Sequence, residues 1–184
     1  MIYITCALLA EASFLVDKYA LQKTDDNYFS IYANVQIKLI ICGIGKINSA
    51  SATTYLLQKY QATKEDKIFN IGTCTTTKET IMIGELFNIK KLIDNCSAHV
   101  YHLKNDGVAL TCVDKALDSV SGIKTPLADM ESAGFYLAAK RFIKLDHIMI
   151  AKVVSDKTDS TLPRSEDIKA LLTPHSKTIG ALLT

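Results

Sequence analysis

Three acidic residues stand at or just past the ends of predicted strands. Glu11 follows the first strand of the chain, Glu131 follows a short extended piece, and Asp156 follows a long apolar strand. In open α/β sheets, sites lie beyond the carboxyl ends of the strands. If these three strand ends converge, three carboxylates face one crevice, where such groups can accept and deliver protons.

Each carboxylate also has an ordinary structural interpretation. Glu11 and Glu131 lie early in predicted helices, where acidic side chains interact favourably with the helix dipole. Asp156 precedes Lys157 and could be a turn residue. For any one of them alone the structural interpretation is favoured. The three together, each after a different strand, favour a functional site.

These carboxylates depend on an alternation of strands and helices along most of the chain. Hydrophobic periodicity predicts strands over residues 2–6, 28–33, 35–42, 67–71, 82–89, 99–103, 108–113 and 147–154, and helices over residues 8–19, 47–60, 131–142 and 165–183. The second and third strands form a hairpin that turns at Asn34. The alternation predicts an α/β fold of three layers, in which helices flank a mixed, mainly parallel central sheet. Because we find no repeats and no linker, residues 1–184 are expected to form a single domain.

The bulk properties of the chain argue against several classes of protein. A length of 184 residues suits one domain, and 21 basic against 19 acidic residues give a net charge of only +2. This balance argues against a protein that binds nucleic acid or a membrane surface. The five cysteines are odd in number and lack CxxC spacing, which is typical of a reducing compartment. The N-terminus is apolar but short and lacks a basic region, so it predicts a buried strand rather than a signal peptide, and we expect a cytoplasmic protein.

Histidine and cysteine side chains are weaker candidates. His99 and His102 are three residues apart, but no third ligand is evident, so we expect no metal site. Cys74 lies in the Thr-rich segment 73–77, which is predicted to be a polar loop after a strand that ends at Gly72. We interpret it as a loop cysteine without a role.

Five segments resemble, in the same order, motifs of the methylthioadenosine/S-adenosylhomocysteine nucleosidases, a branch of the nucleoside phosphorylase superfamily. They are similar to the family's N-terminal acidic segment, glycine-rich turn, Asn-Thr-Gly-Ser segment, Met-Glu ribose motif and Ser-Asp catalytic motif. The matching residues are Ala7–Ala12, Gly43–Ala50, Asn70–Thr73, Asp129–Ala133 and Val153–Asp156. The resemblance covers most of the chain and implies an enzyme that hydrolyses the N-glycosidic bond of a purine nucleoside without a cofactor.

The resemblance implies a role for each acid. Asp156 would protonate N7 of the purine so that the base leaves neutral, and Ser155 would help to orient it. Glu131 would hold the ribose hydroxyls and stabilise the positive charge that grows on the sugar, with Met130 packed against the ribose. Glu11 would position and deprotonate the attacking water.

Two further substrate contacts follow from the same resemblance. Thr73 matches the serine of the Asn-Thr-Gly-Ser segment and is expected to contact the substrate. The family holds the base with a segment that falls at residues 115–118, where Leu117 could pack on the ring. A leucine at such a place is more often part of an ordinary core.

Hydrolysis is favoured over phosphorolysis because the chain lacks the expected anion-binding groups. Phosphorylases of this superfamily carry an arginine where Asn70 stands, and another in the N-terminal loop that here offers Glu11. A carboxylate beside the nucleophile would repel phosphate and suits water. The turn at Gly43 and Gly45 is interpreted as a tight strand-to-helix connection rather than a phosphate-binding loop.

The chain also departs from the family pattern at several positions, so other functions remain as alternatives. Residues 74–77 stand where the family has Gly-Gly, and the chain is short between Glu85 and Val108, and again before Asp129. In relatives the first shortened region lines the pocket for the 5′ substituent, partly across a dimer interface. The sequence therefore does not predict the 5′ substituent of the substrate. A homodimer is implied only by the resemblance. The alternatives are a futalosine-type nucleosidase, a nucleoside phosphorylase, or a non-catalytic nucleoside-binding protein on the same scaffold.

Overall fold

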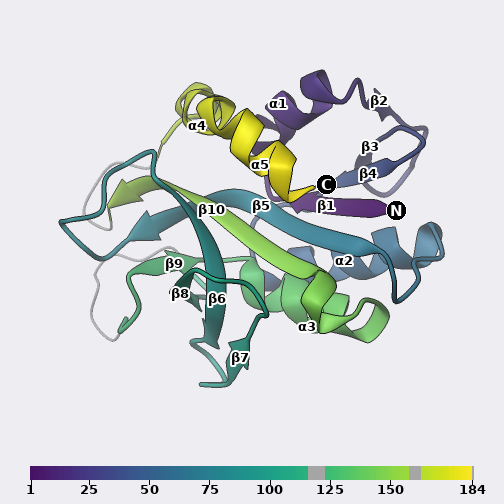
Figure 1. The fold of residues 1–184 in the computed structure, drawn as a ribbon. Coiled ribbons are helices and arrows are strands. Elements are labelled where there is room, and N and C mark those ends of the chain that lie inside the picture. The colour runs from purple at the N-terminus through teal and green to yellow at the C-terminus, as the bar shows by residue number, and fades with distance from the viewer. Residues whose placement is uncertain (116–122, 158–162, 184) are drawn as a thin grey trace.

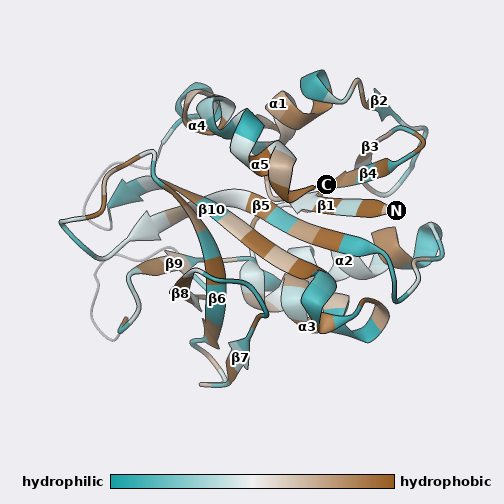
Figure 2. Ribbon diagram, in the orientation of Figure 1, coloured by the Kyte–Doolittle hydropathy of each residue, from teal (hydrophilic) through white to brown (hydrophobic). Residues whose placement is uncertain are grey.

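Four parallel strands form the centre of the molecule. In the computed structural model, which describes residues 1–115, 123–157 and 163–183, β1 (Ile2–Cys6) lies between β4 (Ile37–Ile41) and β5 (Lys67–Thr76), and β10 (Ile148–Lys157) follows β5 (Figure 1). Their sequences are nearly continuous in apolar residues, as expected for strands that are covered on both faces. Hydropathy along the ribbon shows these apolar stretches in the middle of the molecule (Figure 2). Because the four strands are parallel, their carboxyl ends meet at one edge.

The remaining strands extend the sheet in two directions. On one side of the centre, β4 pairs with β3 (Ser30–Ala33) in the predicted hairpin, and β3 pairs with β2 (Gln22–Lys23). The other direction holds four strands: β6 (Leu86–Asp94), β7 (Val100–His102), β8 (Val108–Cys112) and β9 (Leu127–Asp129). Pairings run from β10 through β6, β8 and β9 to β5, and β5 pairs with β10. This half of the sheet therefore closes on itself.

The sheet is mixed, as predicted, and more of its paired residues are parallel than antiparallel. Among the described residues, the pairings divide into five parallel and five antiparallel. The strands β5 and β10 each run for 10 residues, longer than their central neighbours. Each also pairs in the opposite sense with a further strand, Thr75 and Thr76 of β5 with β9 and Ala151 to Val153 of β10 with β6.

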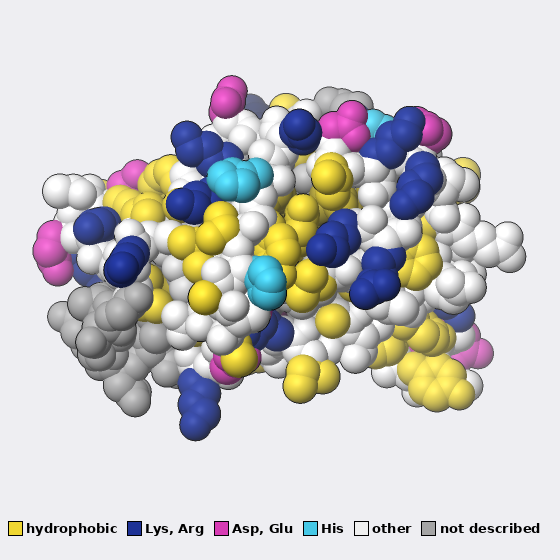
Figure 3. Space-filling view, turned by 90° about the horizontal axis from the view of Figure 1, so that it is seen from below, with side chains coloured by type: hydrophobic (Ala, Val, Ile, Leu, Met, Phe, Trp, Pro, Cys, Tyr) yellow, Lys and Arg dark blue, Asp and Glu magenta, His cyan; other side chains and the backbone are white. Residues whose placement is uncertain are grey.

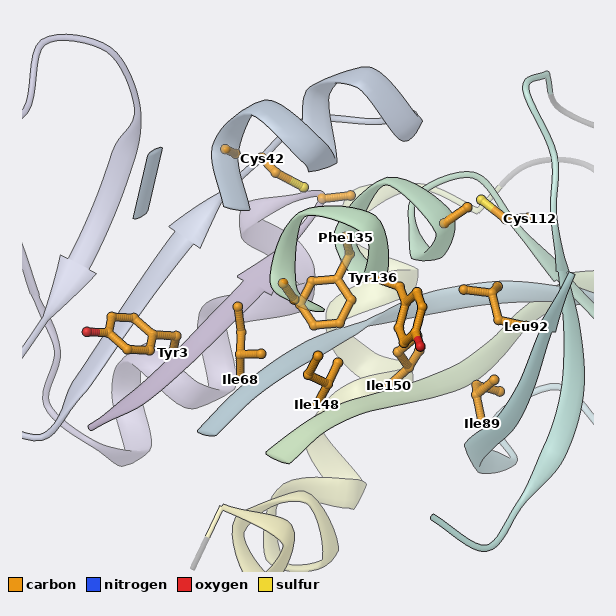
Figure 4. Packing of buried hydrophobic residues seen from close by; sticks show 14 of the residues in the cluster. Tyr3, Cys42, Ile68, Ile89, Leu92, Cys112, Phe135, Tyr136, Ile148 and Ile150 are labelled. Carbon is orange, nitrogen blue, oxygen red and sulfur yellow. The ribbon is translucent and has the colours of Figure 1, made fainter. Parts of the chain in front are cut away.

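Helices cover both faces of the central strands. The helices α1 (Leu9–Lys18), α4 (Ser165–Leu172) and α5 (Ser176–Leu182) lie on one side, and α2 (Lys46–Lys59) and α3 (Ser132–Phe142) lie on the other (Figure 1). Each side has its own buried apolar cluster. Figure 4 shows the cluster under α2 and α3, where Phe135 and Tyr136 face Ile68, Ile148 and Ile150.

The described residues also form two short 3₁₀ helices, and one of them interrupts a predicted helix. They are Leu145–His147 and Thr173–His175. The C-terminal helix predicted over residues 165–183 is divided at Pro174, because proline cannot donate the backbone hydrogen bond of a continuing helix. Within the described ranges no helix has the length and apolar character needed to cross a membrane.

The strand predicted to end at Gly72 continues to Thr76, and this corrects the interpretation of Cys74. Threonine is β-branched and fits the pleated surface of a strand, and here the Thr-rich segment pairs with both β9 and β10. Cys74 is consequently buried in β5 rather than exposed in a loop. Burial raises the pKa of its thiol well above the ordinary value, so Cys74 behaves as a small apolar side chain.

Candidate active site

A cavity of about 240 Å³ lies at the edge where the central parallel strands end. Six of the seven side chains that the sequence indicated line it: Glu11, Thr73, Met130, Glu131, Ser155 and Asp156. They come from the segment after β1, from β5, from the segment after β9 and from β10. The seventh, Leu117, lies outside the described residues.

Glu11 is held in the cavity by four hydrogen bonds. It lies in the first turn of α1 and is 3% exposed. Its Oε2 accepts the backbone N–H groups of Ala7 and Leu8 at 2.9 and 3.0 Å. Its Oε1 accepts the N–H and the hydroxyl of Thr73 at 2.7 and 2.9 Å. The carboxylate therefore has a fixed position between β1 and β5.

Gly72 makes that position of Glu11 possible. A Cβ atom on Gly72 would lie 2.9 Å from Oε1 of Glu11, closer than real Cβ contacts. The side chain of Glu11 is already constrained by its four donors, so it has little freedom to move aside. The glycine in this segment thus serves the carboxylate by leaving room for it.

Glu131 has a different environment although it is equally buried. It precedes α3, is 6% exposed, and its Oε1 accepts one hydrogen bond from the Gly45 N–H at 2.9 Å. Its Oε2 lies 4.0 Å from Nζ of Lys152. Burial raises the pKa of Glu131 from 4.5 to about 7, with Lys152 opposing this shift and Asp129 adding to it. Near neutral pH the charge of Glu131 therefore depends on its immediate neighbours.

Lys152 is the component of the site that the sequence interpretation missed. It lies in β10, is 1% exposed, and its Nζ is 2.8 Å from Oδ2 of Asp129. Burial disfavours its charge, but the carboxylates of Asp129, Glu131 and Glu11 outweigh this and hold the pKa of Lys152 well above its ordinary value. The available signal was a single lysine inside an otherwise apolar strand, since a buried charge needs a partner.

Asp156 enters the cavity through an irregularity of β10. The register shifts there, so that Val154 pairs with Cys74 and Asp156 with Thr75, which leaves Ser155 as an extra residue. Such a bulge changes the direction of the side chains that follow it. The Ser155 hydroxyl lies 2.6 Å from Oδ2 of Asp156 and 3.3 Å from the carbonyl oxygen of Cys74. Asp156 itself is half-buried.

The glycine-rich turn contributes to the site through its backbone. Gly43 and Gly45 have φ values of +80° and +104°, which favour glycine, so the chain can turn sharply from β4 into α2. The N–H of Gly45 points to Glu131 and is occupied by that carboxylate. The turn therefore presents this donor to a side chain of the protein itself.

Asn70 does not line the cavity, although it stands where phosphorylases carry an arginine. It is buried within the sheet, where its Nδ2 lies 3.1 Å from Oγ1 of Thr5 and 3.3 Å from the carbonyl oxygen of Thr5. Its Oδ1 is 3.5 Å from the Ser132 hydroxyl. Asn70 thus links β1, β5 and the start of α3, which supply three sides of the cavity.

The described residues offer carboxylates rather than a metal site. In these ranges no three His, Cys, Asp or Glu side chains are grouped so that they could hold a metal ion. The half-buried acid Asp156 and the buried acids Glu11 and Glu131 instead surround a hollow whose lining is otherwise largely apolar. Such an arrangement is able to protonate one part of a small molecule and to stabilise positive charge on another.

Sequence comparison relates the chain to curated nucleosidases. No protein-family model matches it. The 5′-methylthioadenosine/S-adenosylhomocysteine nucleosidase of Bacillus pumilus is 27% identical over 122 residues, which are 66% of this chain and 46% of the relative. The enzyme of the same name from Bacillus subtilis is 28% identical over 142 residues, 76% of this chain and 55% of the relative. The chain spans about half the length of the curated relatives that it matches.

Solved structures share the fold over almost the whole chain. The 5′-methylthioadenosine nucleosidase of Arabidopsis thaliana has a TM-score of 0.82 and 18% identity, with 98% of this chain and 93% of that chain covered. A futalosine hydrolase of Helicobacter pylori has a TM-score of 0.80 and 14% identity, with 98% and 96% covered. The chain is thus similar in sequence to methylthioadenosine/S-adenosylhomocysteine nucleosidases and shares the fold of solved nucleosidase structures.

Proposed function

We propose that the protein hydrolyses the N-glycosidic bond of a purine nucleoside of the methylthioadenosine or S-adenosylhomocysteine type. The observation that carries the proposal is the convergence of Glu11, Glu131 and Asp156 on one cavity from three separate parts of the chain. The curated sequence relatives carry this activity in their names, which supports the same choice.

In the proposed reaction, Asp156 gives a proton to N7 of the purine as the bond between the base and C1′ of the ribose breaks. The hydroxyl of Ser155, 2.6 Å from Oδ2 of Asp156, orients that carboxyl group. The base leaves with both electrons of the broken bond and is neutral because of the added proton. The sugar is left with positive charge at C1′, close to the carboxylate of Glu131.

Glu11 takes the proton of the water that attacks C1′. Three of its four hydrogen-bond donors are backbone N–H groups with fixed positions. The hydroxyl of Thr73 is the fourth and can rotate. A water molecule that enters can therefore donate to Oε1 of Glu11 beside the Thr73 hydroxyl. The bond from the water oxygen to C1′ completes hydrolysis.

The charges of the cavity favour water over phosphate as the nucleophile. Four carboxylates line it: Glu11, Asp129, Glu131 and Asp156. Two cations lie at the site: Lys152 is paired with Asp129, and Lys157, which also lines the cavity, is paired with Glu79. The carboxylate of Glu11 would repel a phosphate dianion but not a neutral water molecule.

The proposal is tested by incubating the protein with methylthioadenosine and measuring free adenine. Asp156→Asn is expected to lower kcat by about 10²–10⁴-fold, the range for loss of a general acid. Asp146→Asn is the matched control, because Asp146 is an exposed aspartate that precedes β10, whereas Asp156 lies near the other end of that strand. Undiminished adenine release by Asp156→Asn would overturn the assignment of the acid.

Two comparisons of rates separate the neighbouring activities. The rate of base release is measured with and without phosphate, and a strict requirement for phosphate would show that the reaction is phosphorolysis rather than hydrolysis. Faster release of a 6-oxopurine than of adenine would favour the futalosine-type alternative, with which the chain shares its fold. Tight binding of methylthioadenosine without release of a base would leave a nucleoside-binding protein.

Further features of the proposal concern assembly and setting. We propose that residues 1–184 act as one catalytic domain, that two copies associate, and that the reaction serves methionine salvage in the cytoplasm. Apolar side chains gather in the middle of the face seen in Figure 3. Leu137 of α3 and Val100 of β7 are 36% and 45% exposed. Light scattering at several protein concentrations tests the dimer, and a monomer at all of them would contradict it.

A further inference from the structure

The first turns of α2 and α3 approach each other with no space for a side chain. Gly134 lies in the first turn of α3 and is buried. A Cβ atom at this position would lie 1.9 Å from the carbonyl oxygen of Lys46 and 2.8 Å from its carbonyl carbon. Both are backbone atoms, so the contact could be relieved only by moving one helix away from the other.

This approach lies beside the hydrogen bond that holds Glu131. Lys46 is the first residue of α2 and directly follows Gly45, whose N–H donates to Oε1 of Glu131 at 2.9 Å. Glu131 directly precedes α3, and its carbonyl oxygen accepts the N–H of Phe135 within the first turn. The contact of Gly134 and the hydrogen bond of Glu131 thus join the same two helix starts.

We infer that Gly134 is a positioning residue for Glu131, because it lets the start of α2 come close enough for the Gly45 N–H to bind the Glu131 carboxylate. The inference rests on the proposed function insofar as Glu131 binds the ribose. It assigns to a residue outside the cavity lining the task of keeping that carboxylate oriented and charged.

The charged and titratable groups around Glu131 explain why one N–H matters. Lys152 faces it from β10, Asp129 from β9, Glu11 from α1, and the thiol of Cys42 from the end of β4. The cation favours ionisation of Glu131, and the two acids oppose it. A hydrogen bond to the charged form adds to the effect of the cation. Its loss would favour the protonated acid, which binds ribose hydroxyls and stabilises positive charge less well.

The test uses Gly134→Ala in the full chain, with kcat and KM for methylthioadenosine measured between pH 5.5 and 8.5. We expect KM at pH 7 to rise about tenfold, the effect of losing a hydrogen bond to a charged group. The acid side of the kcat/KM profile should move to higher pH. Leu57→Ala is the control, because it removes buried volume from α2 far from its first turn. It should lower the melting temperature and leave KM and the pH profile unchanged.

A second readout separates this inference from the proposed function. Carboxyl ¹³C NMR of Glu-labelled protein, with Glu131 assigned by its loss in Glu131→Gln, should show a higher pKa for Glu131 in Gly134→Ala. This shift is expected even if the protein hydrolyses no nucleoside. An unchanged NMR titration in a folded Gly134→Ala variant would overturn the inference.

If Gly134→Ala does not fold, Gly45→Ala decides the question. Nothing lies within 4 Å of a Cβ at Gly45, so only its φ of +104° is strained by the change. That strain turns the N–H away from Glu131, and the same upward shift of the Glu131 titration is expected. An unshifted titration in Gly45→Ala would count against the inference.

Discussion

The two buried glutamates of the cavity differ in how the protein holds them. Glu11 is 3% exposed and accepts four hydrogen bonds from neutral donors. Glu131 is 6% exposed, accepts one, and lies beside a lysine and an aspartate. Residue type and burial are nearly the same, so neither decides the chemical role. The number and kind of neighbouring groups fix Glu11 in space and leave the charge of Glu131 adjustable.

The largest expected effect comes from removing Lys152, the cation beside Glu131. Lys152→Met leaves Asp129 buried without its partner and Glu131 without its nearest positive charge. Breaking a buried ion pair in this way costs about 3–5 kcal/mol of the free energy of unfolding. Urea denaturation measures the loss, with Lys177→Met on an exposed face of α5 as the control. A loss below about 1 kcal/mol, as for an exposed ion pair, would contradict a buried pair of Lys152 and Asp129.

The second prediction concerns pH. The pKa of Glu131 is raised in the folded protein from 4.5 to about 7, so between these values the folded state binds more protons than the unfolded state. Stability from this group is therefore full below pH 4.5 and is lost as the pH rises through 7, by about 3 kcal/mol at most. Glu131→Gln should flatten this decline in thermal denaturation curves, while Glu166→Gln on exposed α4 should not. An identical decline in Glu131→Gln would assign the proton to another group.

The third prediction concerns a steric change beside Glu11. Gly72→Ala would place a Cβ against Oε1 of Glu11, and we expect kcat to fall about 10²-fold as Glu11 moves from its donors. Gly180→Ala is a matched control, because the nearest atom there is the flexible end of Lys18. Steady-state kinetics on both variants measure the difference. Equal activity of the two would show that Glu11 tolerates displacement.

The smallest expected effect removes a single donor from Glu11. Thr73→Val deletes the hydroxyl that binds Oε1 but keeps the backbone N–H at 2.7 Å. One hydrogen bond to a charged group corresponds to a loss of about tenfold in kcat. Thr73→Ser keeps the hydroxyl and should retain activity. A larger loss in Thr73→Val than in Gly72→Ala would reverse the order of importance proposed here.

The sequence allowed prediction of the cavity but not of its internal contacts. Glu11 and Asp156 could be found because they lie at the carboxyl ends of β1 and β10, which are both parallel to β5. Glu131 follows β9, which reaches the same cavity although it runs antiparallel to β5. The close approach at Gly134 could not be found, because it joins residues 88 positions apart through the packing of two helices (134 against 46). Lys152 left a signal as a charge within an apolar strand, although its partners are known only once β9 and β10 are placed.

The error in the predicted end of β5 has a tertiary cause. Strand ends were read from local sequence, but β5 continues past Gly72 because two other strands pair with it there. The same tertiary pairing closes half of the sheet. Periodicity reports which residues favour a strand, whereas the length of a strand depends on the neighbours that are present.

The extra residue in β10 has a consequence for how such a protein can lose its reaction. The bulge adds one residue to β10 without a partner in β5, so that Ser155 and Asp156 both line the cavity. Deleting Ser155 would restore an unbroken ladder in which Asp156 stays opposite Thr75, and it would remove the hydroxyl that lies 2.6 Å from Oδ2 of Asp156. The fold would keep its strand and its core. A change of length by a single codon, with no acid replaced, would thus take away the group that orients the proposed acid.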